Sequence, residues 1–138
     1  MNQPSTFSES KPPTIRVGTD IVAVERMTKS VARESFLNKV FHPKEIAYCK
    51  SKSVSGPSFA ARFAAKEAFL KALGTGLYAR GMGPLDVWIE HDSQGRPKLM
   101  ISEAARSELE LLGTVDGWDV SLAHEAQFAI ATVVIRFK

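Results

Sequence analysis

The sequence predicts an α+β domain built on a twisted antiparallel sheet with helices on one side of that sheet. Three observations lead to this prediction. Segments of alternating or β-branched residues occur near both ends and in the middle of the chain, helical segments separate them, and one helical segment is long and apolar. The chain has 138 residues, which suits a single domain with one core.

In the first half, TIRVGTDIVAV (14–24) is rich in β-branched residues and predicts a strand. Residues 25–41 and 43–50 have helical character, and Pro43 suits a first helical turn. SKSVSGPS (51–58) predicts a linker within the domain. FAARFAAKEAFLKALGTG (59–76) then predicts a long helix that stops at its glycines.

In the second half, LYARGMGP (77–84) predicts a glycine-containing loop. LDVWIEH (85–91) and PKLMIS (97–102) alternate like two strands joined by a turn. A helix follows, with Ser102 as its N-cap and Gly113 as its stop. WDVSLAH and QFAIATVVIRF predict a final hairpin.

The composition limits the class of protein. We expect 1–13, polar and proline-rich, to be a disordered extension without a secretory signal, and 14–138 to form the one domain. Cys49 is the only cysteine, so no disulfide forms within the chain, and a reducing, cytoplasmic location is expected. No apolar run is long enough for a membrane span. The formal charge of +3, without a dense basic run, favours anionic ligands or an acidic partner over nucleic acid.

The long helix carries four charges in an otherwise apolar segment. Arg62 and Lys66 project among its large apolar side chains, whereas Glu67 and Lys71 border its alanine-rich face. A surface ion pair between Glu67 and Lys71 with two snorkelling cations is one interpretation. A half-buried carboxylate that holds a metal ion beside a polyphosphate is the other.

Asp20 interrupts the apolar strand 14–24. Alternation places it on the same face as Gly18, where the missing side chain lets a ligand or another backbone come close. A buried carboxylate needs a cation, a donor or a metal ion, although bonds to backbone amides at the strand end would also satisfy it. Ser121 and His124 in VSLAHE (120–125) lie near a hairpin turn, and their spacing alone does not indicate a nucleophilic triad.

Together GTDIVAVERM, FAARFAAKEAFLKALGTG and VSLAHEAQFAIA resemble three signature regions of bacterial holo-acyl-carrier-protein synthases, the small type of 4′-phosphopantetheinyl transferase. The resemblance runs from about Ile15 to the C-terminus and implies that family's fold, with the long helix at its centre. It implies transfer of phosphopantetheine from coenzyme A to a serine of apo acyl carrier protein in fatty acid biosynthesis. Adenosine 3′,5′-bisphosphate is the other product.

The resemblance also implies roles for individual residues. Asp20 and Glu67 would bind Mg²⁺ and, with Lys71, form the catalytic set, and Glu67 would orient a water or take the serine proton. Further coenzyme A contacts would come from residues along the helix, the 92–97 turn and the VSLAH segment: Arg62, Lys66, Lys71, Gly74, Gly95, Pro97, Ser121 and His124.

The family assembles as a trimer with sites between neighbouring subunits, so the resemblance implies a homotrimer here. The alanine-rich helix face and segment 128–135 would supply apolar surface for that assembly. Arg26 would dock the acidic carrier protein, with Lys29 and Arg33 extending the basic patch. The alternatives are a non-catalytic carrier-protein or nucleotide-binding module of the same fold, and an Mg²⁺-dependent nucleotide hydrolase.

Overall fold

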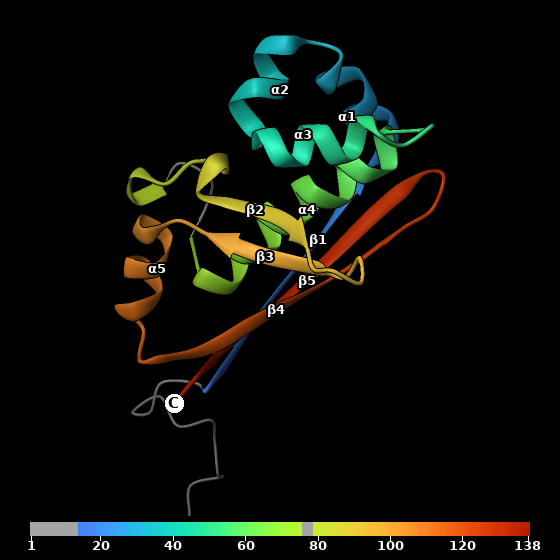
Figure 1. Cartoon of the computed structure of the whole chain (residues 1–138). Coiled ribbons are helices and arrows are strands. Elements are labelled where there is room, and N and C mark those ends of the chain that lie inside the picture. The colour runs from blue at the N-terminus through green and yellow to red at the C-terminus, as the bar shows by residue number, and fades with distance from the viewer. Residues whose placement is uncertain (1–13, 76–78) are drawn as a thin grey trace, which may run out of the picture.

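A three-stranded antiparallel sheet and a long helix packed across one of its faces form the centre of the molecule in the computed structural model (Figure 1). The structure describes residues 14–75 and 79–138. The sheet has the order β1-β5-β4, formed by β1 (Ile15–Ala23), β4 (Val115–His124) and β5 (Phe128–Phe137). A separate two-stranded sheet contains β2 (Val87–His91) and β3 (Pro97–Ile101). The α+β class is confirmed, but the predicted single sheet is two sheets.

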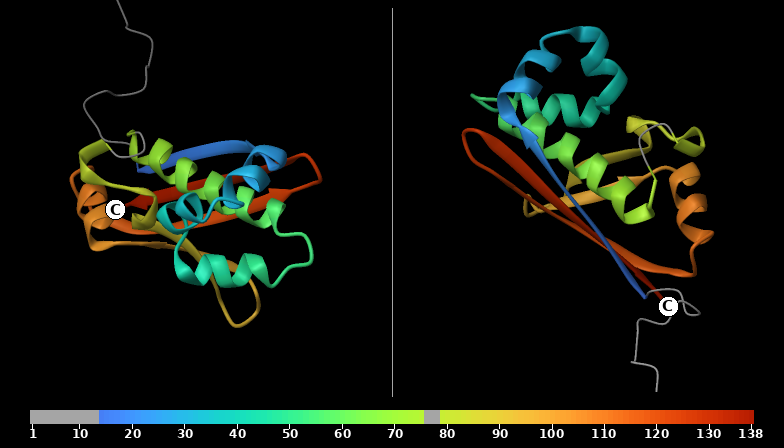
Figure 2. Two further views of the ribbon diagram at one scale, coloured as in Figure 1. Left: turned by 90° about the horizontal axis from the view of Figure 1, so that it is seen from above. Right: turned by 180° about the vertical axis from the view of Figure 1, so that it is seen from behind.

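The helices gather around α4 (Gly56–Leu73), and the two views of Figure 2 show them on one side of the long strands. Three short helices, α1 (Val24–Val31), α2 (Glu34–Val40) and α3 (Pro43–Lys50), cluster near the start of α4, and α5 (Glu103–Glu110) lies toward its end. Short 3₁₀ turns, η1 (Ala79–Gly81) and η2 (Pro84–Asp86), precede β2. Within the described ranges no helix is long and apolar enough to cross a membrane.

Several element boundaries differ from the predicted ones. The helical stretch 25–41 is two helices, because the chain turns at Ala32 and Arg33 between α1 and α2. The predicted linker 51–58 ends early, since α4 begins at Gly56 with Pro57 in its first turn. Gly74 ends α4 with φ 89°, as predicted for a helix C-cap. The predicted disordered extension 1–13, Gly76 and the first two residues of the 77–84 loop lie outside the described residues.

Helix α4 is buried on nearly all sides, which explains why its sequence shows no single apolar stripe. Its alanines belong to the cores that α4 forms with the sheets and with α1 to α3, and they are almost completely buried within this one chain: Ala60, Ala61, Ala64, Ala65, Ala68 and Ala72. The prediction that this alanine face supplies apolar surface for assembly is therefore wrong. The exposed apolar surface lies instead on the outer face of the sheet and includes Val17, Ile21, Ile130 and Val134.

Candidate active site

Strand β1 and helix α4 approach each other closely at Gly18. A Cβ atom added there would lie 2.6 Å from the backbone N of Ala72 and closer still to the carbonyl O of Ala68. Gly18 is therefore required by the neighbouring helix backbone, one of the two reasons the sequence suggested. This contact brings Asp20, two residues further along β1, beside Glu67 of α4.

Asp20 and Glu67 line one pocket of about 340 Å³. The other lining residues come from β1, α1, the beginning of α2 and one aromatic residue of α4: Ile21, Val22, Ala23, Arg26, Met27, Ser30, Phe36 and Phe63. The pocket thus combines two carboxylates with an apolar wall and a cationic side chain.

Lys71 neutralises part of this negative charge. Its Nζ lies 3.0 Å from Oδ1 of Asp20, and the side chains are 55% and 18% exposed. Burial raises the pKa of Glu67 above its ordinary value, the charge of Asp20 raises it further, and Lys71 lowers it. Lys71 therefore pairs with Asp20 across two elements, and not with Glu67 as one of the two interpretations of the helix sequence had it.

The two carboxylates fit a divalent cation. The negative charges of Asp20 and Glu67 repel each other, which contributes to the raised pKa of Glu67, and the single positive charge of Lys71 only partly offsets them. A divalent cation between the two carboxylates would relieve this repulsion. Mg²⁺ is typically held by one or two protein carboxylates, with water and substrate phosphates completing its shell. Elsewhere the described residues contain no cluster of three or more histidine, cysteine or acidic side chains that could hold a metal ion.

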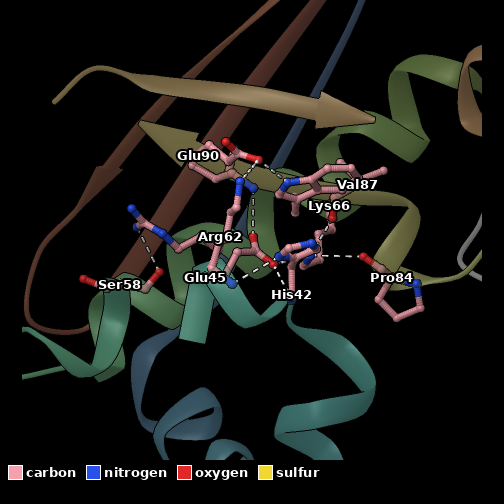
Figure 3. A network of polar contacts seen from close by, with 11 residues as sticks. His42, Glu45, Ser58, Arg62, Lys66, Pro84, Val87 and Glu90 are labelled. Atoms are coloured by element: carbon pink, nitrogen blue, oxygen red, sulfur yellow. Dashed lines mark hydrogen bonds and ion pairs between the residues drawn. The ribbon is translucent and has the colours of Figure 1, made fainter. Parts of the chain in front are cut away.

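Lys66, a predicted coenzyme A contact, has a structural environment. It is 1% exposed, and its ammonium donates to Oε1 of Glu45 at 2.7 Å, to the carbonyl O of Pro84 at 3.0 Å and to that of Val87 (Figure 3). All three N–H groups of the ammonium are thereby used. In this arrangement Lys66 has no donor left for a phosphate, so its burial does not support a cofactor-binding role.

Arg62 is also more buried than a snorkelling cation, at 4% exposure. Nη1 donates to the carbonyl O of Ser58 (Figure 3), and Nη2 lies 2.7 Å from Nε2 of His91. The guanidinium carbon lies 4.4 Å from the centre of the Tyr48 ring. Nε is buried and has no hydrogen-bond partner. Arg62 therefore sits in a different environment from the Asp20–Glu67 pocket, among residues of α3 and β2.

The remaining predicted coenzyme A contacts lie in three other places. Pro97 and Ser121 line a pocket of about 380 Å³ together with Arg96, and Gly95 lies in the preceding turn. His124 lines a separate pocket of about 360 Å³ at the β4–β5 hairpin. The His124 pocket and the Asp20–Glu67 pocket share Ile21 as a wall, so these two surfaces adjoin across β1. Gly74 is exposed at the end of α4.

The three predicted docking cations differ in their surroundings. Arg26 is exposed and lines the Asp20–Glu67 pocket directly. Lys29 pairs with Glu25 at 3.4 Å on the surface of α1. Arg33 precedes α2, with its guanidinium 5.7 Å from the centre of the Phe36 ring. Of these three cations, Arg26 is the one that lines the candidate reaction centre.

Comparison with known protein families identifies the family of this chain. The family model described as the 4′-phosphopantetheinyl transferase superfamily matches residues 16–133. The chain belongs to this family. The matched range contains both carboxylates, Lys71 and every other predicted site residue.

Individual relatives agree with the family assignment. A holo-[acyl-carrier-protein] synthase of Acidithiobacillus ferrooxidans is 43% identical over 126 residues, covering 88% of this chain and 96% of the relative. The fold matches a Helicobacter pylori holo-[acyl-carrier-protein] synthase solved with coenzyme A, with a TM-score of 0.74, 34% identity and coverage of 86% of this chain and 98% of that one. A Bacillus anthracis holo-(acyl-carrier-protein) synthase solved with coenzyme A (3′,5′-ADP) has a TM-score of 0.72, 29% identity and coverage of 89% and 96%.

Two residues that contact the predicted site residues of this family member were missed by sequence analysis. Glu45 is completely buried and accepts hydrogen bonds from Lys66 and from the backbone N–H of His42 and of Ile89. The Pro43 helix start, with an acidic residue in its first turn, was the available signal for a capping box. His91 ends strand β2 and contacts Arg62, and no pattern in the sequence indicated that contact.

Proposed function

We propose that this chain transfers the 4′-phosphopantetheine group of coenzyme A to a serine hydroxyl of apo acyl carrier protein. The observation that carries this proposal is the pocket shared by Asp20 and Glu67, with Lys71 beside it, in a chain of this family. The serine oxygen forms a bond to the β-phosphorus, and the bond from that phosphorus to the bridging oxygen breaks. Adenosine 3′,5′-bisphosphate leaves, and holo acyl carrier protein is the product.

Asp20 and Glu67 are the residues that would hold Mg²⁺. When bound, this ion would neutralise the charge of the pyrophosphate as the serine oxygen approaches. The Lys71 ammonium lies beside Asp20, and its side chain is exposed, so a pyrophosphate can reach its positive charge. Glu67 receives the serine proton, either directly or through a water molecule that it orients.

We place the adenosine end of coenzyme A at the turn before β3. Arg96, Pro97 and Ser121 line a pocket there, and Gly95 exposes backbone beside it. Arg96 pairs with Asp119 of the same pocket at 3.4 Å, and its exposed guanidinium has further N–H donors for a phosphate-bearing ligand. Arg62, His124 and Gly74 remain predicted contacts, whereas Lys66 supports the fold around them.

The carrier protein docks beside Arg26 in this proposal. Acyl carrier proteins are acidic, and Arg26 presents a cation at the rim of the pocket that holds the two carboxylates. Met27, Phe36 and Phe63 give the same pocket an apolar wall for a carrier helix. Arg33 and Lys29 extend the positive surface along α1 and α2.

A homotrimer completes the proposal, because each of the pockets in a single chain is small and open relative to coenzyme A. The outer face of the three-stranded sheet is the surface that we expect neighbouring copies to cover. It exposes apolar side chains from β1 and β5 and has no described element packed over it: Ile15, Val17, Ile21, Phe128, Ile130 and Val134.

Mass spectrometry of the carrier protein tests this function. Apo carrier protein, coenzyme A and Mg²⁺ are incubated with the enzyme, and the carrier should gain one phosphopantetheine group on a serine. An unmodified carrier with free phosphopantetheine in solution would indicate the hydrolase instead. An unmodified carrier with intact coenzyme A would indicate a binding module of the same fold.

A further inference from the structure

His91 lies at the meeting point of three segments that are far apart in the sequence. Its Nε2 is 2.7 Å from Nη2 of Arg62 on α4, and its Nδ1 is 3.2 Å from the carbonyl O of Gly95 in the β2–β3 turn. Its ring stacks on Tyr48 of α3, with 4.0 Å between centroids and 20° between planes. One half-buried imidazole therefore contacts α3, α4 and the turn.

The chemistry of the two neighbours determines which ring nitrogen of His91 carries the proton. An arginine side chain has only donors, so Nε2 must accept the hydrogen bond from Arg62. A backbone carbonyl only accepts, so Nδ1 must carry the hydrogen and donate it to Gly95. His91 joins the two groups only as the neutral Nδ1–H tautomer.

The 92–96 turn has local bonds of its own, and its Arg96 pairs with Asp119 of β4 at 3.4 Å. Oδ1 of Asp92 accepts from the backbone N–H of Gln94 and of Arg96, and the Gly95 N–H donates to the carbonyl O of Asp92. These bonds fix the shape of the turn. Neither they nor the Arg96–Asp119 pair connects the turn to α4, whereas the His91 contacts do.

Arg62 depends on the same imidazole. Its guanidinium has two hydrogen-bonding partners, Ser58 and His91, and its Nε has none. Loss of the His91 acceptor would leave the buried cation with a second unsatisfied nitrogen. An unsatisfied buried donor is costly, so Arg62 would be expected to move.

We propose that His91 is a positioning residue for coenzyme A. It links the Gly95 carbonyl to the Arg62 guanidinium and so orients the turn from the α4 side, while Asp119 pairs with Arg96 from β4. Arg96 and Pro97 are thereby placed at the pocket that they line with Ser121. This inference rests on the proposed function, which puts the adenosine end of coenzyme A at that pocket. His91 touches no reacting group, so its effect appears in coenzyme A binding and not in the chemical step.

Nitrogen NMR of the free protein tests the geometry independently of any activity. In neutral His91 the ¹⁵N shifts should show the proton on Nδ1, and the amide signals of 92–96 should shift in His91→Phe. A proton on Nε2 would overturn the inference, because Arg62 would then face a donor.

Kinetics of His91→Phe test the consequence. Phenylalanine keeps the ring on Tyr48 but removes both hydrogen bonds, so KM for coenzyme A should rise about five- to tenfold, the effect of losing roughly one hydrogen bond of ordinary strength. The kcat and the KM for carrier protein should stay within about twofold of wild type, since the carboxylate pocket is unchanged. His91→Gln, which retains an acceptor and a donor, should recover part of the coenzyme A affinity.

His42→Phe is the matched control. His42 also stacks on an aromatic ring, that of Trp88 at 4.9 Å, and loses one hydrogen bond, from the Lys44 N–H, when replaced. Its ring contacts are to Trp88 and Lys44 and not to Arg62 or Gly95, so KM for coenzyme A should not change even if stability falls. A similar rise of KM for coenzyme A in His42→Phe would overturn the inference, because both effects would then reflect a general loss of stability.

Arg96→Ala separates failure of the inference from failure of the proposed ligand placement. If KM for coenzyme A rises in Arg96→Ala but not in His91→Phe, the pocket is correct and His91 does not position it. If neither variant changes KM for coenzyme A, the placement of the adenosine end is wrong, and the inference fails with it.

Discussion

Lys66 and Lys71 lie on the same helix and have opposite environments. Lys66 is enclosed by Glu45 and two carbonyl groups, while the Lys71 side chain is 55% exposed and reaches Asp20. Burial lowers the pKa of Lys66, and Glu45 partly reverses this effect. We therefore assign Lys66 to stability and Lys71 to the pyrophosphate.

Removal of Glu45 tests the structural role of this buried pair. Glu45→Ala leaves the Lys66 ammonium buried without its anion, so the free energy of unfolding should fall by about 3–5 kcal/mol in urea denaturation. The double variant Glu45→Ala/Lys66→Met should lose less, because no unpaired charge remains. As a control, Lys44→Ala breaks the exposed pair with Glu90 and should change stability by less than about 1 kcal/mol. Equal losses in Glu45→Ala and Lys44→Ala would contradict the buried-pair account.

Cys49 provides a second test at the residue scale. Burial raises the pKa of its thiol from the ordinary 9.0 to about 12, so the thiolate is scarce and the sulfur is inaccessible in the folded state. A thiol reagent at about pH 8 should label the protein only as fast as it unfolds, and labelling in urea should be rapid. The folded thiol keeps a proton that the unfolded chain releases near pH 9.0, so stability should fall as the pH rises from 9.0 toward 12. Fast labelling of native protein would show that the packing around Cys49 is wrong.

The sequence predicted the chemistry of single residues better than their partners. It identified Asp20 as a carboxylate that needs a counter-charge, but the Asp20–Lys71 pair depends on how β1 crosses α4. It placed Lys66 among apolar groups, but Glu45 lies 21 positions away on another helix and gave no local signal of contact. Long-range pairs of this kind depend on tertiary packing, which periodicity does not encode.

At the scale of elements, the contact between β1 and α4 aligns the two carboxylates. The sequence predicted both elements, because β-branched residues and a long apolar helix are strong local patterns. It did not predict that β2 and β3 form a sheet of their own, since alternation does not specify which strands pair. The central position of α4 was predicted from the resemblance to the family and not from the local pattern of residues.

Gly18→Ala tests the importance of this close contact. The added methyl group would collide with the α4 backbone, so stability should fall by at least about 2 kcal/mol as β1 and α4 separate. Gly117→Ala is the control, because a Cβ atom there meets nothing within 4 Å and the cost should stay near 0.5 kcal/mol. Thermal and urea unfolding measure both variants. Similar stabilities for the two would mean that β1 and α4 are less closely packed than the structure shows.

At the scale of the whole molecule, the open face of the three-stranded sheet is the feature that a single chain does not explain. Val17 and Val134 are paired in register on this face, as are Ile21 and Ile130, and all four side chains are exposed. A contiguous exposed apolar patch of this kind typically marks an interaction surface.

A charge at the centre of this face should prevent assembly. Val17→Asp should convert the expected trimer to monomers in light scattering, because the carboxylate would be buried without a partner in the interface. Wild-type activity should also fall on dilution as subunits separate. Leu111→Asp is a matched control, since Leu111 is 73% exposed at the end of α5 and should leave assembly unchanged. A wild-type monomer that is fully active at assay concentration would rule out shared sites.

The central claim is that the carboxylates brought together by β1 and α4 form the reaction centre. The most direct measurement is the rate of carrier-protein modification, followed by mass spectrometry at several Mg²⁺ concentrations, for Asp20→Asn and Glu67→Gln. Both substitutions keep the shape of the side chain and remove its charge, so each should slow transfer by on the order of a hundredfold or more with the protein still folded. Asp116→Asn, which removes a carboxylate paired with Arg136 on other strands, should react like wild type. Near-normal transfer by folded Asp20→Asn or Glu67→Gln at moderate Mg²⁺ would contradict the claim.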